Sequence, residues 1–283
     1  MRRVKAPARV VEQFHAFSSG EREPAEPRNA ATVILLRDGA SRPEAYLLRR
    51  QGSMAFAAGM YVYPGGGVDE RDFDAHLAWA GPTPEEWAEQ LGTDVPMATA
   101  LVCAAVRETF EESGVLLAGT STDDVVADTT GDDWEADRQA LEGKELAFTD
   151  FLEQRGLVLR TDLLGVWAAW LTPIFEPRRY RTWFFVASLP RGQRTRDVST
   201  ESSEVVWLPV AEALAQADDG SIGMMPPTYL NALEVDQHAT VADVLAAAAG
   251  RRVEMFMPTL TEADGEAVLT FPESLRELIE ARP

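Results

Sequence analysis

Short apolar runs alternate with polar turns that contain glycine or proline along much of the chain, a pattern that is typical of β-strands. The first two runs, 31–37 and 44–50, are separated by Asp-Gly-Ala-Ser-Arg-Pro and predict the strands of a hairpin. The other runs that predict strands are 60–63, 183–189, 205–209, 253–257 and 267–271. We therefore expect a sheet as one component of the fold.

A helical period replaces this pattern between Met97 and Ser113. At about 100° per residue, one stripe of this helix is apolar and predicts its core face; the stripe consists of Val102, Cys103, Val106 and Phe110. Gly114 follows the last turn, where a glycine commonly ends a helix. Further helices are expected over 10–17, 72–80, 84–91, 148–156, 210–216, 227–234 and 241–249, whereas the acidic segment 120–145 is expected to be a loop.

The other side of the same helix carries an acidic cluster. Glu108, Glu111 and Glu112 lie at i, i+3 and i+4, so their carboxylates converge on one side of the last turns. Like charges at this spacing destabilise a helix by about 0.2–0.5 kcal/mol per pair. A divalent cation would remove that repulsion, because hard cations bind several carboxylate oxygens. The alternative is a solvated surface, but apolar residues one or two turns earlier indicate that this side is partly covered.

The residues from Arg107 to Val115 read Arg-Glu-Thr-Phe-Glu-Glu-Ser-Gly-Val and resemble the second half of the Nudix hydrolase box. Upstream, Tyr-Pro-Gly-Gly-Gly at 63–67 resembles the aromatic-Pro-Gly-Gly entry of that box. The family spacing counted from Gly66 gives Asp72 as the acid of the first half, where Glu is common. The box is then interrupted by an insertion over 73–97, and Thr109 replaces the usual aliphatic residue. This interruption is similar to the Nudix subgroup that includes acyl-coenzyme A diphosphatases.

A second stretch resembles the same subgroup, with Trp-Leu-Thr-Pro at 170–173, Arg-Arg-Tyr at 178–180 and Phe-Phe at 184–185. The resemblance implies an α+β Nudix fold, an α/β/α sandwich with a mixed β-sheet between helices, a helical insertion within the box and a C-terminal extension. The expected division is a flexible N-terminal arm over 1–28, a Nudix hydrolase domain over 29–217 with its insertion over 73–97, and an extension over 218–283 packed on the same domain.

The resemblance also implies a metal site, in which Mg²⁺ or Mn²⁺ is held by Glu108, Glu111 and Glu112 and by the backbone carbonyl of Gly66. Glycine permits the close backbone approach that such a carbonyl needs, although a tight turn would explain the glycines equally well. Of the carboxylates, Glu112 and Glu108 are the surest ligands by resemblance.

Three further acidic or basic positions belong to this expected site. Arg107 is expected to orient the acids by pairing with Glu111 or Asp72. Nudix enzymes often use one more acid from outside the box, and Glu204 or Glu201 is the candidate here. The alternative for both is a solvated charge at the entry of a strand.

Two arginine pairs are candidates for binding substrate phosphates, because guanidinium groups form bidentate hydrogen bonds to phosphate. They are Arg49 with Arg50, and Arg178 with Arg179. In a strand, alternation places only one residue of such a pair on the side of the site. An ion pair to one of the many nearby acids is the equal alternative.

Composition limits the partners. The net charge is −20, with a sequence pI of about 4.5, which argues against non-specific binding to nucleic acid or to an anionic membrane. No apolar run approaches the ~20 residues of a membrane span, and no signal sequence is expected, because the first residues lack its apolar segment. Cys103 is the single cysteine, so no intrachain disulfide can form, and a cytoplasmic location is expected.

The expected activity is metal-dependent hydrolysis of a diphosphate linkage in a nucleoside diphosphate derivative, with coenzyme A or an acyl-CoA as first choice from the subgroup resemblance. Alternatives are NADH, ADP-ribose and dinucleotides such as diadenosine polyphosphates. A different class is a catalytically silent Nudix module that binds a nucleotide and regulates a partner. The expected partner is a small molecule, and a homodimer is an open expectation for the assembly.

Overall fold

The structure is a computed structural model that describes residues 8–20, 23–53, 57–73, 77–263 and 266–282 of the chain. At its centre lies a mixed β-sheet. Strand β1 (Arg28–Asp38) pairs in parallel with β9 (Tyr180–Ser188) and antiparallel with β2 (Pro43–Arg50). The strand order is β10 (Ser202–Pro209), β2, β1, β9, β8 (Leu164–Leu171) and β11 (Met255–Phe256), while β3 (Tyr61–Val62) pairs with β2 and β4 (Gly65–Gly67) with β1.

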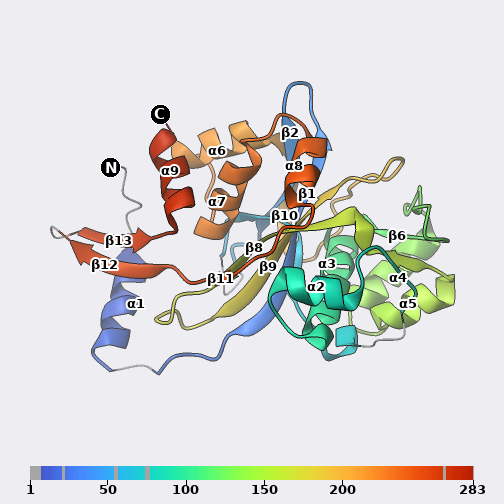
Figure 1. The fold of residues 1–283 in the computed structure, drawn as a ribbon, viewed down its shortest axis with the longest axis horizontal. Coiled ribbons are helices and arrows are strands. Elements are labelled where there is room, and N and C mark those ends of the chain that lie inside the picture. The colour runs from blue at the N-terminus through green and yellow to red at the C-terminus, as the bar shows by residue number, and fades with distance from the viewer. Residues whose placement is uncertain (1–7, 21–22, 54–56, 74–76, 264–265, 283) are drawn as a thin grey trace.

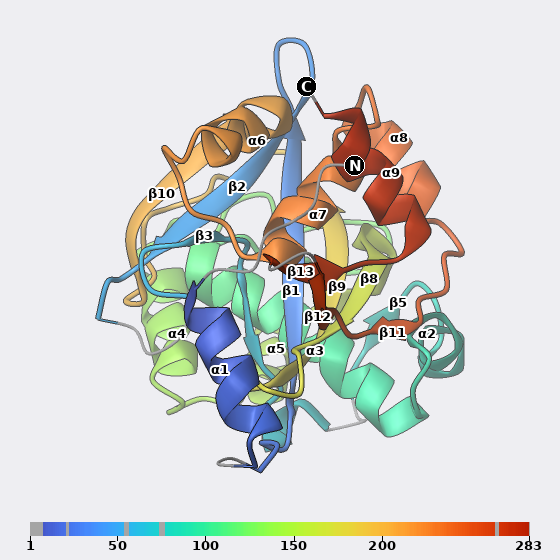
Figure 2. The same ribbon diagram turned by 90° about the vertical axis from the view of Figure 1, so that its left-hand side faces the viewer.

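Helices cover both faces of this sheet (Figures 1 and 2). One layer holds α2 (Pro84–Leu91), α3 (Val95–Ser113), α4 (Asp132–Glu142) and α5 (Phe148–Arg155), and the other holds α6 (Val210–Asp218), α7 (Pro226–Val235) and α8 (Val241–Ala248). Along β1, Val33 packs into the core of the α3 layer and Ile34 into the opposite core. Both faces of the strand are therefore buried, which explains its continuous apolar run. The expected α/β/α sandwich is confirmed.

Helix α3 lies in the middle of its layer and is buried on nearly all sides. The whole predicted apolar stripe is inaccessible to solvent, as are the alanines between its members. Asp94 caps the N-terminus by accepting a 2.8 Å hydrogen bond from Met97 N, and Gly114 ends the helix with a φ of 74°. Buried Thr109 donates its hydroxyl to Ala105 O at 2.7 Å. A polar residue is tolerated at this position because its hydroxyl has a partner within the helix.

The insertion in the box packs against the N-terminal half of α3 and the edge of the sheet. Its helix α2 has the predicted bounds, and Trp87 stacks edge-on against Phe185 at 5.9 Å between ring centroids. The expected helix over 72–80 is wrong: a 3₁₀ turn covers Glu70–Phe73, strand β5 covers Trp79–Ala80, and 74–76 lie outside the described residues. Strand β5 joins a small second sheet with β7 (Val158–Arg160) and β6 (Ala118–Gly119).

The acidic segment expected to be a loop contains helix α4, so that expectation is wrong for 132–142. The acids of its first turn, Asp132, Asp133 and Glu135, stabilise a helix N-terminus through the helix dipole. Trp134 supplies the tertiary contact, edge-on to Phe110 of α3 at 6.4 Å between ring centroids. Packing against α3, rather than local propensity, thus accounts for this helix.

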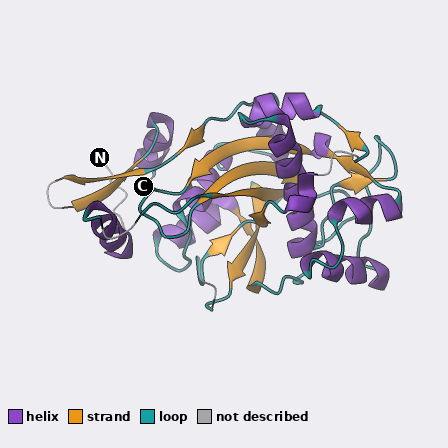
Figure 3. Ribbon diagram, turned by 90° about the horizontal axis from the view of Figure 1, so that it is seen from below, coloured by secondary structure: helices purple, strands orange, loops and turns teal. Residues whose placement is uncertain are grey.

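The first and the last described helices lie at the same end of the molecule (Figures 1 and 2). Helix α1 (Ala8–Ser18) contacts the main body through Phe14, whose ring lies edge-on to Phe175 at 5.6 Å. The hairpin of β12 (Thr259–Ala263) and β13 (Glu266–Thr270) extends away from the central sheet (Figure 3), and α9 (Glu273–Ala281) follows it. The sequence predicted neither β12 nor α9. Residues 1–7 and 21–22 of the expected arm lie outside the described residues. Within the described ranges, no helix has the length and apolar character to cross a membrane.

Candidate active site

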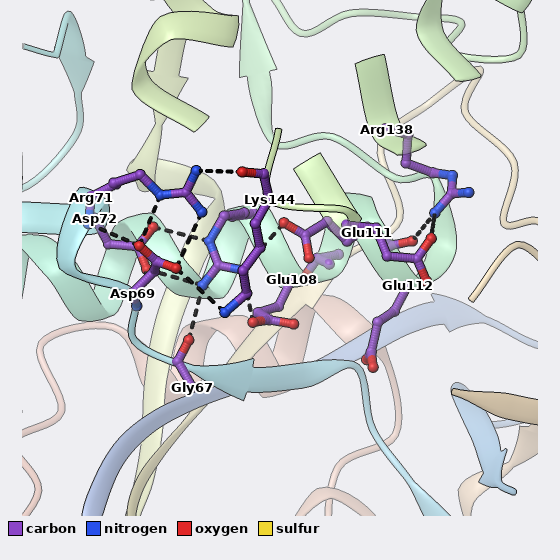
Figure 4. A network of polar contacts seen from close by, with 12 residues as sticks. Gly67, Asp69, Arg71, Asp72, Glu108, Glu111, Glu112, Arg138 and Lys144 are labelled. Carbon is purple, nitrogen blue, oxygen red and sulfur yellow. Dashed lines mark hydrogen bonds and ion pairs between the residues drawn. The ribbon is translucent and has the colours of Figure 1, made fainter. Parts of the chain in front are cut away.

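The glycine strand β4 lies against the acidic turn of α3, although the two are distant in the chain (Figure 4). Gly65 N–H donates a 2.8 Å hydrogen bond to Glu112 Oε2. A Cβ added at Gly66 would overlap the carboxylate of Glu108, so the strand can approach this side chain only because the residue is glycine. The expected proximity of the glycine segment and the helix acids is confirmed.

The register of β4 against β1 directs its backbone groups. Val33 N donates to Pro64 O just before β4, and Val68 N donates to Asn29 O just after it. In an antiparallel ladder every second residue pair is hydrogen-bonded, so the Gly66–Ala31 pair between these two is also a hydrogen-bonded pair. The carbonyl of Gly66 therefore points into β1, which contradicts its expected role as the metal-binding carbonyl. The backbone groups of the residues on either side point away from β1: Gly65 N donates to Glu112, and Gly67 O accepts from Arg107 at 2.9 Å.

The buried guanidinium of Arg107 joins the two halves of the box. Its Nε and Nη2 donate hydrogen bonds of 3.0 and 2.9 Å to the two carboxylate oxygens of Asp72. Its Nη1 donates to Glu108 Oε1 at 2.8 Å and to Glu111 Oε1 at 3.2 Å. Burial opposes the charge, but the acids, Glu108 foremost, hold the pKa of Arg107 above its usual value. Arg107 thus pairs with both of the acids between which the sequence left the choice open.

The acids of α3 point in two directions (Figure 4). Glu108 and Glu112 face β4, whereas Glu111 faces Arg107. In the described part of the chain, no group of at least three His, Cys, Asp or Glu side chains is arranged as a ready-made metal cage. The donors that face β4 are therefore a pair of carboxylates rather than the expected trio.

These acids are poorly compensated by the protein itself. Burial raises the pKa of Glu111 to about 7, Glu108 adds to this shift and Arg107 opposes it. Burial, and then the charge of Glu108, raise the pKa of Glu112 well above its usual value. Burial also raises the pKa of Glu108 despite its ion pair with Arg107. A divalent cation facing Glu108 and Glu112 would supply the missing charge, so the residues present fit such an ion.

Glu201, rather than Glu204, is the outside acid that the structure brings to the cluster. Glu204 accepts a 2.9 Å hydrogen bond from Tyr61 and lies 3.7 Å from Arg49, on the sheet face that packs against α6 and α7. Alternation along β10 turns it away from α3, which contradicts its expected role as a metal ligand. Glu201 pairs with Arg50 at 3.2 Å, and its charge helps raise the pKa of both acids that face β4.

In β2, one arginine of the candidate pair faces the acids. Tyr46 and Leu48 belong to the core of the α3 layer, so alternation places Arg50 on that side and Arg49 on the other. The positive charge of Arg50 opposes the rise in the pKa of Glu112, and its buried Nε has no hydrogen-bond partner. Arg49 therefore lies on the sheet face opposite to the acids and pairs with Glu204, whereas Arg50 lies on their side; binding of phosphate by either arginine stays a prediction.

The other arginine pair lies in the connection between β8 and β9. Arg179 is buried, and its guanidinium donates to the backbone carbonyls of Thr172 at 3.1 Å and Ala25 at 3.0 Å. It holds this connection to the N-terminal segment, which contradicts the expectation that it binds substrate phosphate. Arg178 is exposed, and its expected role stays a prediction.

The sequence interpretation missed a buried arginine that touches the acidic turn. Arg138 of α4 donates a 2.7 Å hydrogen bond to the backbone carbonyl of Glu111 and pairs with Glu135 and Glu142. The signal was present, because Glu135 and Glu142 flank Arg138 at helical spacings of three and four residues. It was not used because the segment was interpreted as a loop.

Comparison with known proteins identifies the family and the fold. Residues 80–234 match the family profile described as the NUDT19 Nudix domain. The chain is 23% identical over 265 residues to the acyl-coenzyme A diphosphatase NUDT19 of Xenopus laevis, covering 81% of this chain and 70% of the relative. It is 24% identical over 292 residues to the protein of that name from Gallus gallus, covering 84% and 76%. Its fold is similar to the crystal structure of a NUDIX hydrolase from Alicyclobacillus acidocaldarius, with a TM-score of 0.67, 23% identity, and coverage of 78% of this chain and 96% of that chain.

The contact between Gly66 and Glu108 gives a direct test of the site. We expect Gly66→Ala to fold but to weaken Mn²⁺ binding by about tenfold or more, because the added methyl group displaces the Glu108 carboxylate. Mn²⁺ titration by electron paramagnetic resonance measures this effect. Gly67→Ala is the matched control, since its Cβ would meet only Asn29 O at 3.9 Å. Equal affinities of the two variants would contradict the assignment.

Metal binding is expected to be linked to pH through these carboxylates. The pKa of Glu111 rises from 4.5 to about 7 in the folded protein, so its charge destabilises the metal-free fold above about pH 7, and this penalty disappears below about pH 4.5. The pKa values of Glu108 and Glu112, which face the proposed ion, are raised as well, so Mg²⁺ binding to these carboxylates would displace protons. We therefore expect a larger Mg²⁺-induced rise in Tm at about pH 8 than at about pH 6, with proton release in calorimetry. An equal rise at both pH values would refute this linkage.

Proposed function

Because the chain belongs to the family described as the NUDT19 Nudix domain, we propose that this Nudix hydrolase cleaves the diphosphate linkage of a coenzyme A ester. The substrate class is supported by the relatives from Xenopus laevis and Gallus gallus, both named acyl-coenzyme A diphosphatase. The observation that carries the proposal at the site is the contact of β4 with Glu108 and Glu112, whose charges the protein compensates only in part. Such an intact acid set favours an enzyme over a silent binding module.

The cofactor in this proposal is Mg²⁺, with Mn²⁺ as a substitute. Glu108 and Glu112 would hold it, together with the carbonyl of Gly65 and with Glu201 as the nearby outside acid. When bound, the ion polarises a phosphoryl oxygen and neutralises the charge that develops as the diphosphate is cleaved. Glu111 has a different task in this scheme, because its carboxylate pairs with Arg107 and so fixes the guanidinium that orients Glu108.

Arg50 is proposed to bind a substrate phosphate. Its guanidinium already pairs with Glu201 through Nη2, yet its Nε is buried without a partner, an arrangement that costs free energy until an acceptor arrives. A phosphate oxygen supplies such an acceptor and gains a charge-assisted hydrogen bond. This proposal is supported by the position of Arg50 on the α3 side of β2, the side on which Glu112 lies, and by the effect of its charge on the pKa of Glu112.

The reaction adds one water molecule across a P–O bond of the diphosphate. The water oxygen bonds to one phosphorus, the bridging oxygen leaves with the other phosphate, and a proton is released. From coenzyme A, the products are a phosphopantetheine and an adenosine bisphosphate. This chain contributes positioning and electrostatic stabilisation, since Arg50 meets phosphate charge and Arg107 keeps the carboxylates in fixed orientations.

We also propose that the enzyme acts in the cytoplasm, a reducing compartment. This is supported by Cys103, which is the single cysteine of the sequence and is buried in α3, so that no intrachain disulfide can form.

The substrate proposal is tested by incubating the enzyme and Mg²⁺ with coenzyme A, an acyl-CoA, NADH, ADP-ribose and a diadenosine polyphosphate, and by identifying products by mass spectrometry. We expect the coenzyme A compounds to have a kcat/KM at least about tenfold above the others. Preference for a dinucleotide or ADP-ribose would replace the substrate class but keep the reaction. Cleavage of none of them would overturn the proposed function.

The choice of outside acid is tested with a pair of matched variants. Glu201→Gln should lower kcat/KM at subsaturating Mg²⁺ by about tenfold or more, because Glu201 lies with the acids that face β4. Glu204→Gln should change it by less than about threefold, because its partners are Tyr61 and Arg49 on the other face. The reverse order of effects would restore Glu204 as the outside ligand.

A further inference from the structure

We propose that helix α4 braces the active site, with Arg138 and Glu142 as positioning residues that hold Glu201 in place relative to the acids of α3. The inference rests on the proposed function, since the placement of Glu201 matters only if those acids hold a metal ion. It concerns a helix that lies outside the box motif and whose residues had no expected role in the sequence.

The brace begins at the C-terminal end of α3. The last four carbonyls of a helix lack partners within it. Arg138, which is 2% exposed, donates from Nη1 to the Glu111 carbonyl at 2.7 Å, and its positive charge is favourable at a helix C-terminus. Figure 4 shows Arg138 pointing at the backbone beside Glu111 and Glu112. The turn that carries the active-site acids is therefore anchored to α4.

The same arginine reaches the outside acid through a carboxylate. Arg138 Nη1 donates to Glu142 Oε2 at 3.0 Å. The other oxygen of Glu142 accepts from Thr200 N at 2.9 Å and from Thr200 Oγ1 at 2.7 Å. Thr200 immediately precedes Glu201, so one continuous chain of hydrogen bonds runs from the Glu111 carbonyl to the backbone next to Glu201.

A second connection runs parallel to the first. Glu135 of α4 accepts a 2.6 Å hydrogen bond from Arg196, whose backbone N–H donates to Ser113 O at 2.9 Å. From the opposite side, Gln51 N donates to Glu201 O at 3.0 Å. The segment that leads into β10 is thus fixed by α4 and the end of α3 on one side and by the end of β2 on the other.

This fixation answers a problem that the position of Glu201 creates. Its side chain is 54% exposed, and an exposed glutamate loses rotamer freedom when it is held in one orientation. A rigid backbone at Thr200 and Glu201 removes part of that cost before a ligand binds. Groups that orient metal ligands commonly account for factors of about 10–100 in metal affinity or activity. The geometry assigns this task to Arg138 and Glu142.

The test uses Glu142→Ala, with Mn²⁺ as the probe. We expect the Kd for Mn²⁺, measured by electron paramagnetic resonance on the metal-free enzyme, to rise about tenfold. The Mg²⁺ concentration for half-maximal activity should rise by a similar factor, while kcat at saturating Mg²⁺ stays near that of the wild type. A merely structural role would lower Tm without moving the Kd. Arg155→Ala is the matched control. Arg155 of α5 pairs with Asp133 and Asp137 of α4, and it forms no ion pair with α3 or with the segment before β10 among the described residues.

Thr200→Val keeps the test valid if Glu142→Ala does not fold, because it removes one hydrogen bond to Glu142 and preserves side-chain shape. It should weaken Mn²⁺ binding in the same direction by a smaller factor. An unchanged Kd in a folded brace variant, with normal binding by the wild type, overturns the brace alone. Absence of Mn²⁺ binding and of diphosphate cleavage in the wild type overturns the proposed function instead.

Discussion

One buried cation, Arg107, controls the arrangement of the site. Its guanidinium donates to Asp72, Glu108 and Glu111 and to the Gly67 carbonyl, so it joins the 3₁₀ turn, the glycine strand and the helix in one network. Breaking a buried pair of this kind leaves charge without a partner, which is strongly unfavourable. The two halves of the box are therefore joined by this contact rather than by their spacing in the sequence. That explains how the chain accommodates the insertion with α2 between them.

The alternation of a strand then determines which groups can act beside this network. Arg50 and Glu201 lie on the side of α3, while Arg49 and Glu204 pair with each other on the opposite side. The same two-residue period acts on the backbone of β4, where Gly65 offers its groups to the site and Gly66 uses its own within the sheet. Arg49 and Arg50, although they are neighbours in sequence, therefore lie on opposite faces of the sheet.

Much of the fold could be predicted from local periodicity. The stripe of α3, the bounds of α2 and most strands of the central sheet follow directly from the spacing of apolar residues. Helix α4 was missed because the acidic composition of its segment was interpreted as a loop, although Glu135 and Glu142 flank Arg138 at helical spacings; Trp134 and Arg138 supply the contacts to α3, which the sequence does not specify. The role of Arg179 was equally hidden, since the carbonyls that bind it lie in segments distant in the chain. The approach of β4 to α3 required family resemblance, because no local pattern specifies which segments meet.

The net charge of −20 adds a constraint on how an anionic substrate binds. A strongly acidic surface does not attract a diphosphate from a distance, and at physiological ionic strength such effects fall off over about 8 Å. Attraction must then come from groups within the site, where Arg50 would supply one charge in the proposed role, while much of the positive charge of Arg107 is already matched by acids. In the proposed site, a divalent ion held by Glu108 and Glu112 would supply the remainder. Metal binding and substrate binding are therefore expected to be coupled in this protein: carboxylates that repel the substrate when the ion is absent become part of its binding site when the ion is present.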